Sequence, residues 1–360
     1  MSVKVLRKSS GRVLSGTGFI IGPVADSIFI IGAPLLSLIC GAIIYSIPKQ
    51  YFDIQIRSQT VDSRLFFLQS FINAHLFLVY FRSHANVSIF KLHRWSFTVV
   101  PGLVFLLGGI SPAILGLMGL VGVWWDVYHS SLQTFGFGRI YDSKMKNAAN
   151  AGRSLDFWMN LLVYTGPILG GATFFNHLQN SVMSLGFLSI DSQMLDDLLV
   201  NRTPFFLMEN QIYLTLAILI FGVGFVVYYL AAYYRLSQQG YRVSWQKVWL
   251  MSITSGVSIY CWGFHSFIVA FWVMYVFHAL QYFAIVSFVE KKNLANLFHV
   301  SNYQRSGLLV VIWLTSFGFL YGVWSAFFAE GDWWKSVTLT TSLMHFWYDG
   351  FIWSVSKKQV

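Results

Sequence analysis

Charged side chains are scarce in this chain, and that scarcity excludes most classes of water-soluble protein. Only 11% of the 360 residues are charged, whereas 56% are hydrophobic, and the mean hydropathy is +0.59. A soluble domain carries far more charge than this. Apolar runs recur along the whole length, which favours one helical bundle embedded in a lipid bilayer.

Cysteine is also rare, and the two that occur, Cys40 and Cys261, both fall within apolar stretches. Neither a disulfide framework nor a thiolate metal site is expected from them. Walker loops, Rossmann glycine patterns, serine-hydrolase elbows and zinc-protease motifs are missing as well. The excess of Lys and Arg gives a net charge of +10, but these residues occur in small clusters between apolar runs. We therefore expect no nucleic-acid partner.

The apolar runs predict an all-α integral membrane protein with about ten transmembrane helices in a single domain, residues 1–360. Each run approaches or exceeds the roughly 20 residues that cross the hydrocarbon core of a bilayer. The predicted spans lie near 18–47, 64–82, 95–109, 112–141, 155–180, 209–235, 247–264, 266–289, 306–329 and 336–355.

The basic residues predict how the helices are oriented. Alternate connections, beginning with the N-terminus, hold all 24 Lys and Arg residues except Lys49, Arg57, Arg64, Arg202 and Lys335. The positive-inside rule assigns the basic connections to the cytoplasm, so both termini are expected there. Of the outer connections, 50–63 is predicted to lie flat on the membrane surface or to be a plain loop. The longer connection 181–208 is a candidate lid or interfacial helix.

Four histidines fall within predicted spans, and all four spans run from the outer side to the cytoplasm: His75, His129, His278 and His345. Ionisable residues inside a membrane are costly and usually face the interior of a bundle. A rise of 1.5 Å per residue, counted from the cytoplasmic ends, brings the four imidazoles to within roughly 10 Å of one another in depth. One layer in the cytoplasmic half can therefore hold all of them.

Carboxylates and amides accompany these histidines at helical spacing or at similar depth: Asp26, Asp126, Asp349, Gln133 and Gln281. Imidazole and carboxylate without thiolate suit iron, zinc, copper or manganese. A carboxylate can also orient an imidazole that binds a metal. We predict a metal site formed by the four histidines with Asp349, Asp126 and Asp26. Catalytic roles are expected for Asp349, Gln133 and Gln281.

Three segments carry recognisable signatures. Residues 128–136 read YHxxxQxxG, residues 278–282 read HxxQY, and residues 345–353 read HxxxDGFIW. They resemble segments of bacterial multi-spanning membrane proteins of uncharacterised activity. More loosely, the chain resembles the histidine-rich non-haem iron oxygenases and desaturases of membranes, although it has no HxxxH or HxxHH box. The resemblance implies a multi-pass protein of the bacterial cytoplasmic membrane with a metal held by histidines.

These features predict a metal-dependent membrane oxidoreductase or oxygenase that acts on a lipid-soluble substrate. Its cofactor would be one or two iron ions, with zinc or copper as alternatives, and it would need an electron donor. Two other classes stay open. Four histidines on four helices can supply two axial pairs to haem, and intramembrane His and Asp also occur in metal-ion or proton-coupled transporters. The simplest alternative is that each histidine is bonded to a neighbouring helix.

Overall fold

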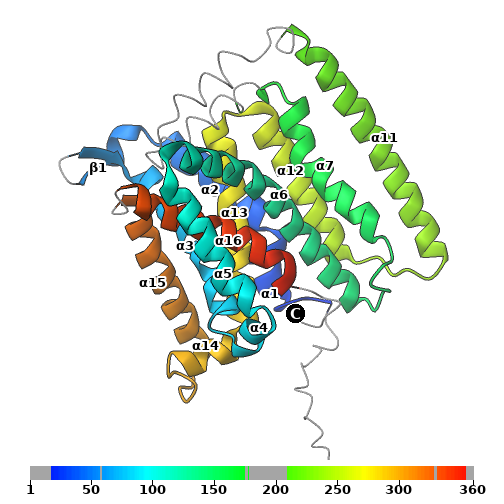
Figure 1. Ribbon diagram of the computed structural model, residues 1–360. Coiled ribbons are helices and arrows are strands. Elements are labelled where there is room, and N and C mark those ends of the chain that lie inside the picture. Colours follow the sequence, from blue (N-terminus) through cyan, green and yellow to red (C-terminus); the bar gives the residue numbers. More distant parts are fainter. Residues whose placement is uncertain (1–17, 57–58, 175–176, 178–208, 328–330, 354–360) are drawn as a thin grey trace, which may run out of the picture.

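A computed structural model describes residues 18–56, 59–174, 177, 209–327 and 331–353, and within these residues the chain is mostly helical (Figure 1). The predicted all-α class is confirmed. Within the described residues, each predicted span overlaps a helix or, for the first, a bent pair of helices. The helices are α1 Pro23–Asp26, α2 Ala33–Ser46, α3 Ser63–Ser83, α4 Val87–Leu92, α5 Arg94–Ile110, α6 Pro112–Lys144, α7 Arg153–Gly170, α11 Gln211–Gln238, α12 Trp245–Phe264, α13 Phe267–Val289, α14 Lys291–Leu297, α15 Ser306–Phe327 and α16 Asp332–Ile352.

Among the described residues, three helices are long and apolar enough to cross a membrane: α11, α13 and α15. The bent pair α1–α2 adds a fourth if it forms one span. The apolar stretch of α11 has no buried residue, and such an exposed hydrophobic surface indicates contact with lipid. Of the other predicted spans, α5 is apolar but only 17 residues long.

The helices that carry the four histidines pack around a common centre. In Figure 1, α16 lies among α3, α5 and α6, while α13 packs against α2, α3 and α12. The helix α15 packs closely along α3 because Gly322 has no side chain. A Cβ atom there would lie only 2.0 Å from the carbonyl oxygen of Ser70. In contrast, α11 lies at the edge of the bundle against α7.

The first span bends by 57° where a π-helical turn, Ser27–Ile31, separates α1 from α2. Pro34 lacks the N–H group that would bond the carbonyl four residues earlier, which is that of Ile30. The side-chain amide of Gln281 on α13 donates to this carbonyl instead, at 2.8 Å. The bend therefore ties the first span to a helix that carries one of the histidines.

A second proline, Pro101, also leaves a backbone carbonyl without its helical hydrogen bond, and a side chain from another segment bonds to that carbonyl instead. Pro101 lies inside α5 and cannot bond the carbonyl of Phe97. His84, just after α3, donates to that oxygen through Nε2 at 3.1 Å, and its Nδ1 lies 2.8 Å from the hydroxyl oxygen of Ser83. Backbone groups within a membrane need such internal partners. His84 thus connects α3 to α5.

The third proline of this kind gives a stability prediction. Pro167 lies inside α7, and the hydroxyl of Ser258 on α12 donates to the free carbonyl of Val163 at 2.7 Å. Ser258→Ala leaves that buried oxygen without a partner, which costs about 1–3 kcal/mol. We expect a lower midpoint of thermal unfolding in detergent. The control is Ser255→Ala, because that hydroxyl bonds a carbonyl of its own helix; equal losses for both variants would contradict the prediction.

The connection 50–63 is not the plain loop that was one of its two predicted forms. A 3-10 turn, Lys49–Tyr51, leads into an antiparallel hairpin of β1, Asp53–Ile56, and β2, Gln59–Asp62. Its β-branched residues favour extended structure, and this preference decides the local conformation because no helical apolar period competes with it. The second outer connection, 181–208, lies outside the described residues.

Candidate metal centre

The four histidines of the predicted spans meet in one cluster, and each comes from a different helix: α3, α6, α13 and α16. The ring centroid of His75 lies 5.1 Å from those of His278 and His345. The ring of His129 lies 5.0 and 4.9 Å from the same two rings. His278 and His345 are 6.4 Å apart. The four imidazoles therefore occupy the corners of a compact quadrilateral in which neighbouring rings are steeply inclined.

The cluster is shielded from solvent, and most of its ring nitrogens have no hydrogen bond of normal geometry. His75, His278 and His345 are 0% exposed and His129 is 4% exposed. Both ring nitrogens of the first three and Nε2 of His129 make no such bond, although the backbone of Ile72 lies near His75 and that of Leu76 near His345. A buried polar atom without a partner costs about 1–3 kcal/mol. A neutral imidazole offers one lone pair and keeps one N–H, so a metal ion bound by the four rings would satisfy four of these seven nitrogens. The convergence of four imidazole lone pairs indicates a metal site.

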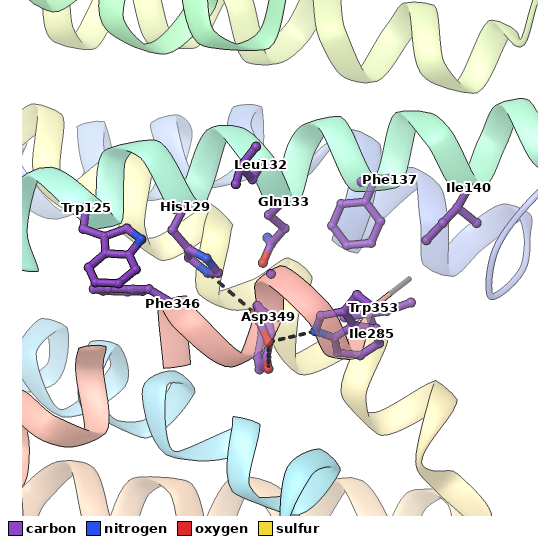
Figure 2. A pocket seen from close by; sticks show the side chains of 13 residues that line it. Trp125, His129, Leu132, Gln133, Phe137, Ile140, Ile285, Phe346, Asp349 and Trp353 are labelled. Carbon is purple, nitrogen blue, oxygen red and sulfur yellow. Dashed lines mark hydrogen bonds and ion pairs between the residues drawn. The ribbon is translucent and has the colours of Figure 1, made fainter. Parts of the chain in front are cut away.

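Asp349 completes the cluster from the end of α16. The hydroxyl of Tyr282 and the indole N–H of Trp353 both donate to its Oδ1, at 2.9 and 2.8 Å. Its Oδ2 lies 3.6 Å from Nε2 of His129, as Figure 2 shows, and 3.7 Å from Nε2 of His345. These separations exceed a hydrogen bond. They are close to the spacing of about 3.4 Å between two ligands that share a tetrahedral ion.

Two sets of three ligands result. One set contains His75, His278 and His345, and the other contains His129, His345 and Asp349; within each set the ligand atoms lie within 4.8 Å of one another. His345 belongs to both sets. The arrangement therefore suits either one ion or two neighbouring ions, in agreement with the donor types that iron, zinc and related metals accept.

Comparison of the chain with protein-family profiles, curated proteins and solved structures finds no match.

The structure does not bring Asp26 to this cluster. Its carboxylate accepts hydrogen bonds from the backbone N–H groups of Ile20, Ile21 and Gly22 at 2.6, 2.8 and 3.2 Å. The hydroxyl of Tyr141 donates to it as well, at 2.9 Å. These four donors occupy the carboxylate, so Asp26 fixes the entry to α1 and is outside both sets of ligands.

Asp126 is also outside both sets of ligands. It lies one turn before His129 on α6, buried, and the Ser130 hydroxyl approaches it at 3.5 Å. Tyr275 on α13 is its other polar neighbour. Asp126 lines a separate cavity, described below. The depth of a residue in a helix, which the sequence gives, does not fix the direction in which its side chain points.

Gln133 and Gln281 connect the helices around the cluster. The amide nitrogen of Gln133 donates to Oε1 of Gln281 at 2.9 Å and to the carbonyl oxygen of His278 at 3.1 Å. Gln281 in turn donates to the first span. The two amides therefore hold α6 and α13 in register beside the imidazoles. Only Oε1 of Gln133 has no partner, so it alone of these amide groups offers a free acceptor to a ligand.

A pocket of about 100 Å³ opens beside His129 and Asp349. Figure 2 shows that both side chains point into it, together with Gln133. Its remaining walls come from α6, α13 and α16 and are largely aromatic or aliphatic: Trp125, Leu132, Phe137, Ile140, Tyr282, Ile285, Phe346 and Trp353. The site therefore combines metal-binding donors with a wall that suits an apolar molecule.

Tyr282 and Trp353 were not predicted as site residues, although both occur in the signature segments. Trp353 follows Asp349 by four residues, which places the two on one face of the helix. Tyr282 has the same spacing from His278, but it contacts Asp349 on another helix, a contact that the sequence does not disclose. Both act by positioning the carboxylate.

The positioning role of Tyr282 gives a prediction. Tyr282→Phe removes one of two donors to Asp349, and loss of such an outer partner lowers metal affinity about 10-fold or more. Titration of the metal-free protein with Zn²⁺ measures this. Tyr348→Phe is the control, because that buried hydroxyl makes no hydrogen bond. Unchanged affinity in Tyr282→Phe would show that Asp349 does not bind the ion.

Proposed function

We propose that this chain is a metal-dependent membrane oxidoreductase or oxygenase that acts on a lipid-soluble substrate. The observation that carries the proposal is the cluster of four buried imidazoles and Asp349, which come from four helices and supply two sets of three closely spaced ligand atoms. One or two iron ions are the proposed cofactor, since this donor set suits iron and leaves coordination positions open. A bound iron ion would supply the redox chemistry.

We further propose that all ten helices or bent pairs cross the bacterial cytoplasmic membrane, with both termini in the cytoplasm. Three strongly apolar helices and the exposed face of α11 support membrane insertion. The more polar helices bury most of their His and Asp residues, which are then shielded from lipid: His75, Asp126, His129, Asp142, Asp156 and His345. The excess of basic residues in alternate connections supports the orientation.

The spacing of the histidines favours ions over haem. A haem iron with two axial imidazoles needs the flat macrocycle between the two rings. The widest of the measured pairs, His278 and His345, is 6.4 Å apart, but His75 and His129 each lie about 5 Å from both of these rings. They occupy the space that a macrocycle would need, whereas a small ion fits at the centre.

The pocket beside Asp349 supports an apolar substrate. Its aromatic wall excludes water from the face of the cluster, and Oε1 of Gln133 is available to a single hydroxyl or amide donor. Asp349 is fixed by Tyr282 and Trp353, so it holds its free oxygen toward the imidazoles without reorganising. The same residues would keep a hydrophobic molecule next to the ion while excluding bulk solvent.

Transport is the competing class, and the layout of the cluster argues against it. The metal-type ligands lie in one layer, whereas a conduction path needs polar groups through the thickness of the membrane. In the experiment, purified protein in nanodiscs made from bacterial lipids is loaded with Fe²⁺ and given a chemical reductant. We expect oxygen consumption with modification of an added or co-purified lipid, both lost in His278→Ala. A Soret band, or metal flux into proteoliposomes that His278→Ala abolishes, would overturn the proposal.

A further inference from the structure

A second cavity lies next to the histidine cluster and is separate from the pocket in Figure 2. It measures about 160 Å³ and is lined by α3, α6, α13 and α16, the same helices that carry the histidines. Phe346 lines both cavities, so its ring forms part of the wall between them. Polar residues three positions before a histidine line this cavity: Asp126, Tyr275 and Ser342.

That spacing places the polar residues one helical turn from the imidazoles. Asp126, Tyr275 and Ser342 precede histidines on three different helices, so they form a layer that covers the cluster. No histidine lines the cavity, so this layer separates the cavity from the imidazoles. A molecule in the cavity would lie one helical turn from the histidine cluster, with Phe346 between it and the pocket described above.

The cavity combines a largely apolar wall with a few polar side chains, among which Asp126 and Tyr275 form a pair; the others are Gln69, Asn73 and Ser342. Leu68, Ile72 and Phe271 are typical of the wall. Asp126 and Tyr275 are only 3% and 4% exposed, and they approach each other closely enough to hydrogen bond. No Lys or Arg lines the cavity among the described residues. A buried carboxyl group that has no cation beside it and faces an apolar chamber is a site for a hydrogen-bonding ligand.

We propose that this cavity binds a lipid-soluble molecule whose head is a six-membered ring, or a group of similar size, with one hydroxyl or carbonyl oxygen. The oxygen would bond to Asp126 and Tyr275, and the apolar walls would enclose the ring. The size follows from the volume, because an apolar cavity of about 150 Å³ accommodates benzene. The identification of this ligand as the substrate rests on the proposed function. Binding of the ligand to the cavity does not require the metal.

The glycines that line the two cavities provide a matched pair of blocking variants. A Cβ atom at Gly122, in the second cavity, would meet only Leu343 at 3.8 Å. A Cβ atom at Gly136, in the pocket of Figure 2, would meet nothing within 4 Å. Neither position has a positive φ angle. Leucine at either site can therefore be built without a backbone clash, and each variant fills one cavity.

The test uses metal-free, detergent-purified full-length protein and ¹⁹F NMR with 4-fluorophenol as the probe. We expect saturable broadening of the probe signal that unlabelled phenol reverses. Gly122→Leu should abolish it and Gly136→Leu should retain it. Tyr275→Phe and Asp126→Leu should weaken 4-fluorophenol about 10-fold through the lost hydrogen bond, with little change for fluorobenzene.

Three outcomes would overturn the proposal. These are retention of binding in Gly122→Leu, loss of binding in Gly136→Leu alone, and equal weakening of 4-fluorophenol and fluorobenzene by Tyr275→Phe. The variant His345→Ala separates the two proposals. If it binds the phenol but no metal, the cavity is independent of the metal centre; if the wild-type protein binds the phenol but no metal, the proposed function fails while the cavity stands.

Discussion

His345→Ala is expected to remove all specifically bound metal from the purified protein. This imidazole is the only ligand common to both sets, in which it joins His75 and His278 on one side and His129 and Asp349 on the other. Its loss leaves each set with two ligands, too few for a stable site. Metal content per chain, measured by mass spectrometry after loading and desalting, should fall from one or two ions to none.

Variants that remove a ligand from only one of the two sets provide a comparison for His345→Ala. His75→Ala leaves His129, His345 and Asp349 intact, so a protein with two ions should keep one of them. His299→Asn is the control, since His299 is an exposed histidine outside the cluster. Thermal unfolding of each variant identifies any that fail to fold. Normal metal content in folded His345→Ala would refute the assignment of both ligand sets.

Asp156→Ala is expected to cause the largest loss of stability. The carboxylate of Asp156 on α7 is paired with Arg139 of α6 at 2.8 Å and with Lys247 of α12 at 3.1 Å. The hydroxyls of Tyr229 and Tyr233 on α11 donate to its other oxygen, at 2.8 and 2.6 Å. Removal of one partner from a buried charge cluster costs about 3–5 kcal/mol. The midpoint of thermal unfolding in detergent should fall sharply.

The remaining carboxylate of that cluster, Asp142, cannot compensate fully. It already bonds both cations and accepts a hydrogen bond from Tyr241 at 2.5 Å. Burial and this bond raise the pKa of Tyr241, so its hydroxyl remains a donor. Asp332→Ala is the control, because its pair with Lys335 is exposed and long at 3.9 Å and is worth less than about 1 kcal/mol. Equal shifts in the two variants would contradict the prediction.

The sequence predicted that the four histidines lie close together, but not the directions in which the neighbouring carboxylates point. Rise per residue placed the four histidines in one layer, and the structure brings their rings within 4.9–6.4 Å for the measured pairs. Asp349 also followed, because a spacing of four residues fixes its side relative to His345. The prediction for Asp26 was wrong. Counting residues along a helix cannot show that the backbone N–H groups of Ile20 and Ile21 donate hydrogen bonds to its carboxylate.

The helices were predictable for a similar reason, and their irregularities were not. Apolar length locates a span to within a few residues, as for α13. It does not reveal that Gln281 satisfies the carbonyl freed by Pro34, since Gln281 lies 251 positions from Ile30 along the chain. The hairpin of β1 and β2 was not predicted for a similar reason. Its conformation depends on pairing between the two strands, and the hydropathy of a segment gives no information about such pairing.

The most direct test of the metal centre is X-ray absorption spectroscopy at the edge of whichever metal the purified or reconstituted protein binds. Nitrogen and oxygen ligands should appear at about 2.0–2.2 Å, with the outer-shell scattering of at least two imidazoles. His345→Ala should abolish this signal, and Tyr282→Phe should change it. Absence of bound iron, zinc, copper and manganese after reconstitution, or a ligand shell without imidazole scattering, would contradict the account.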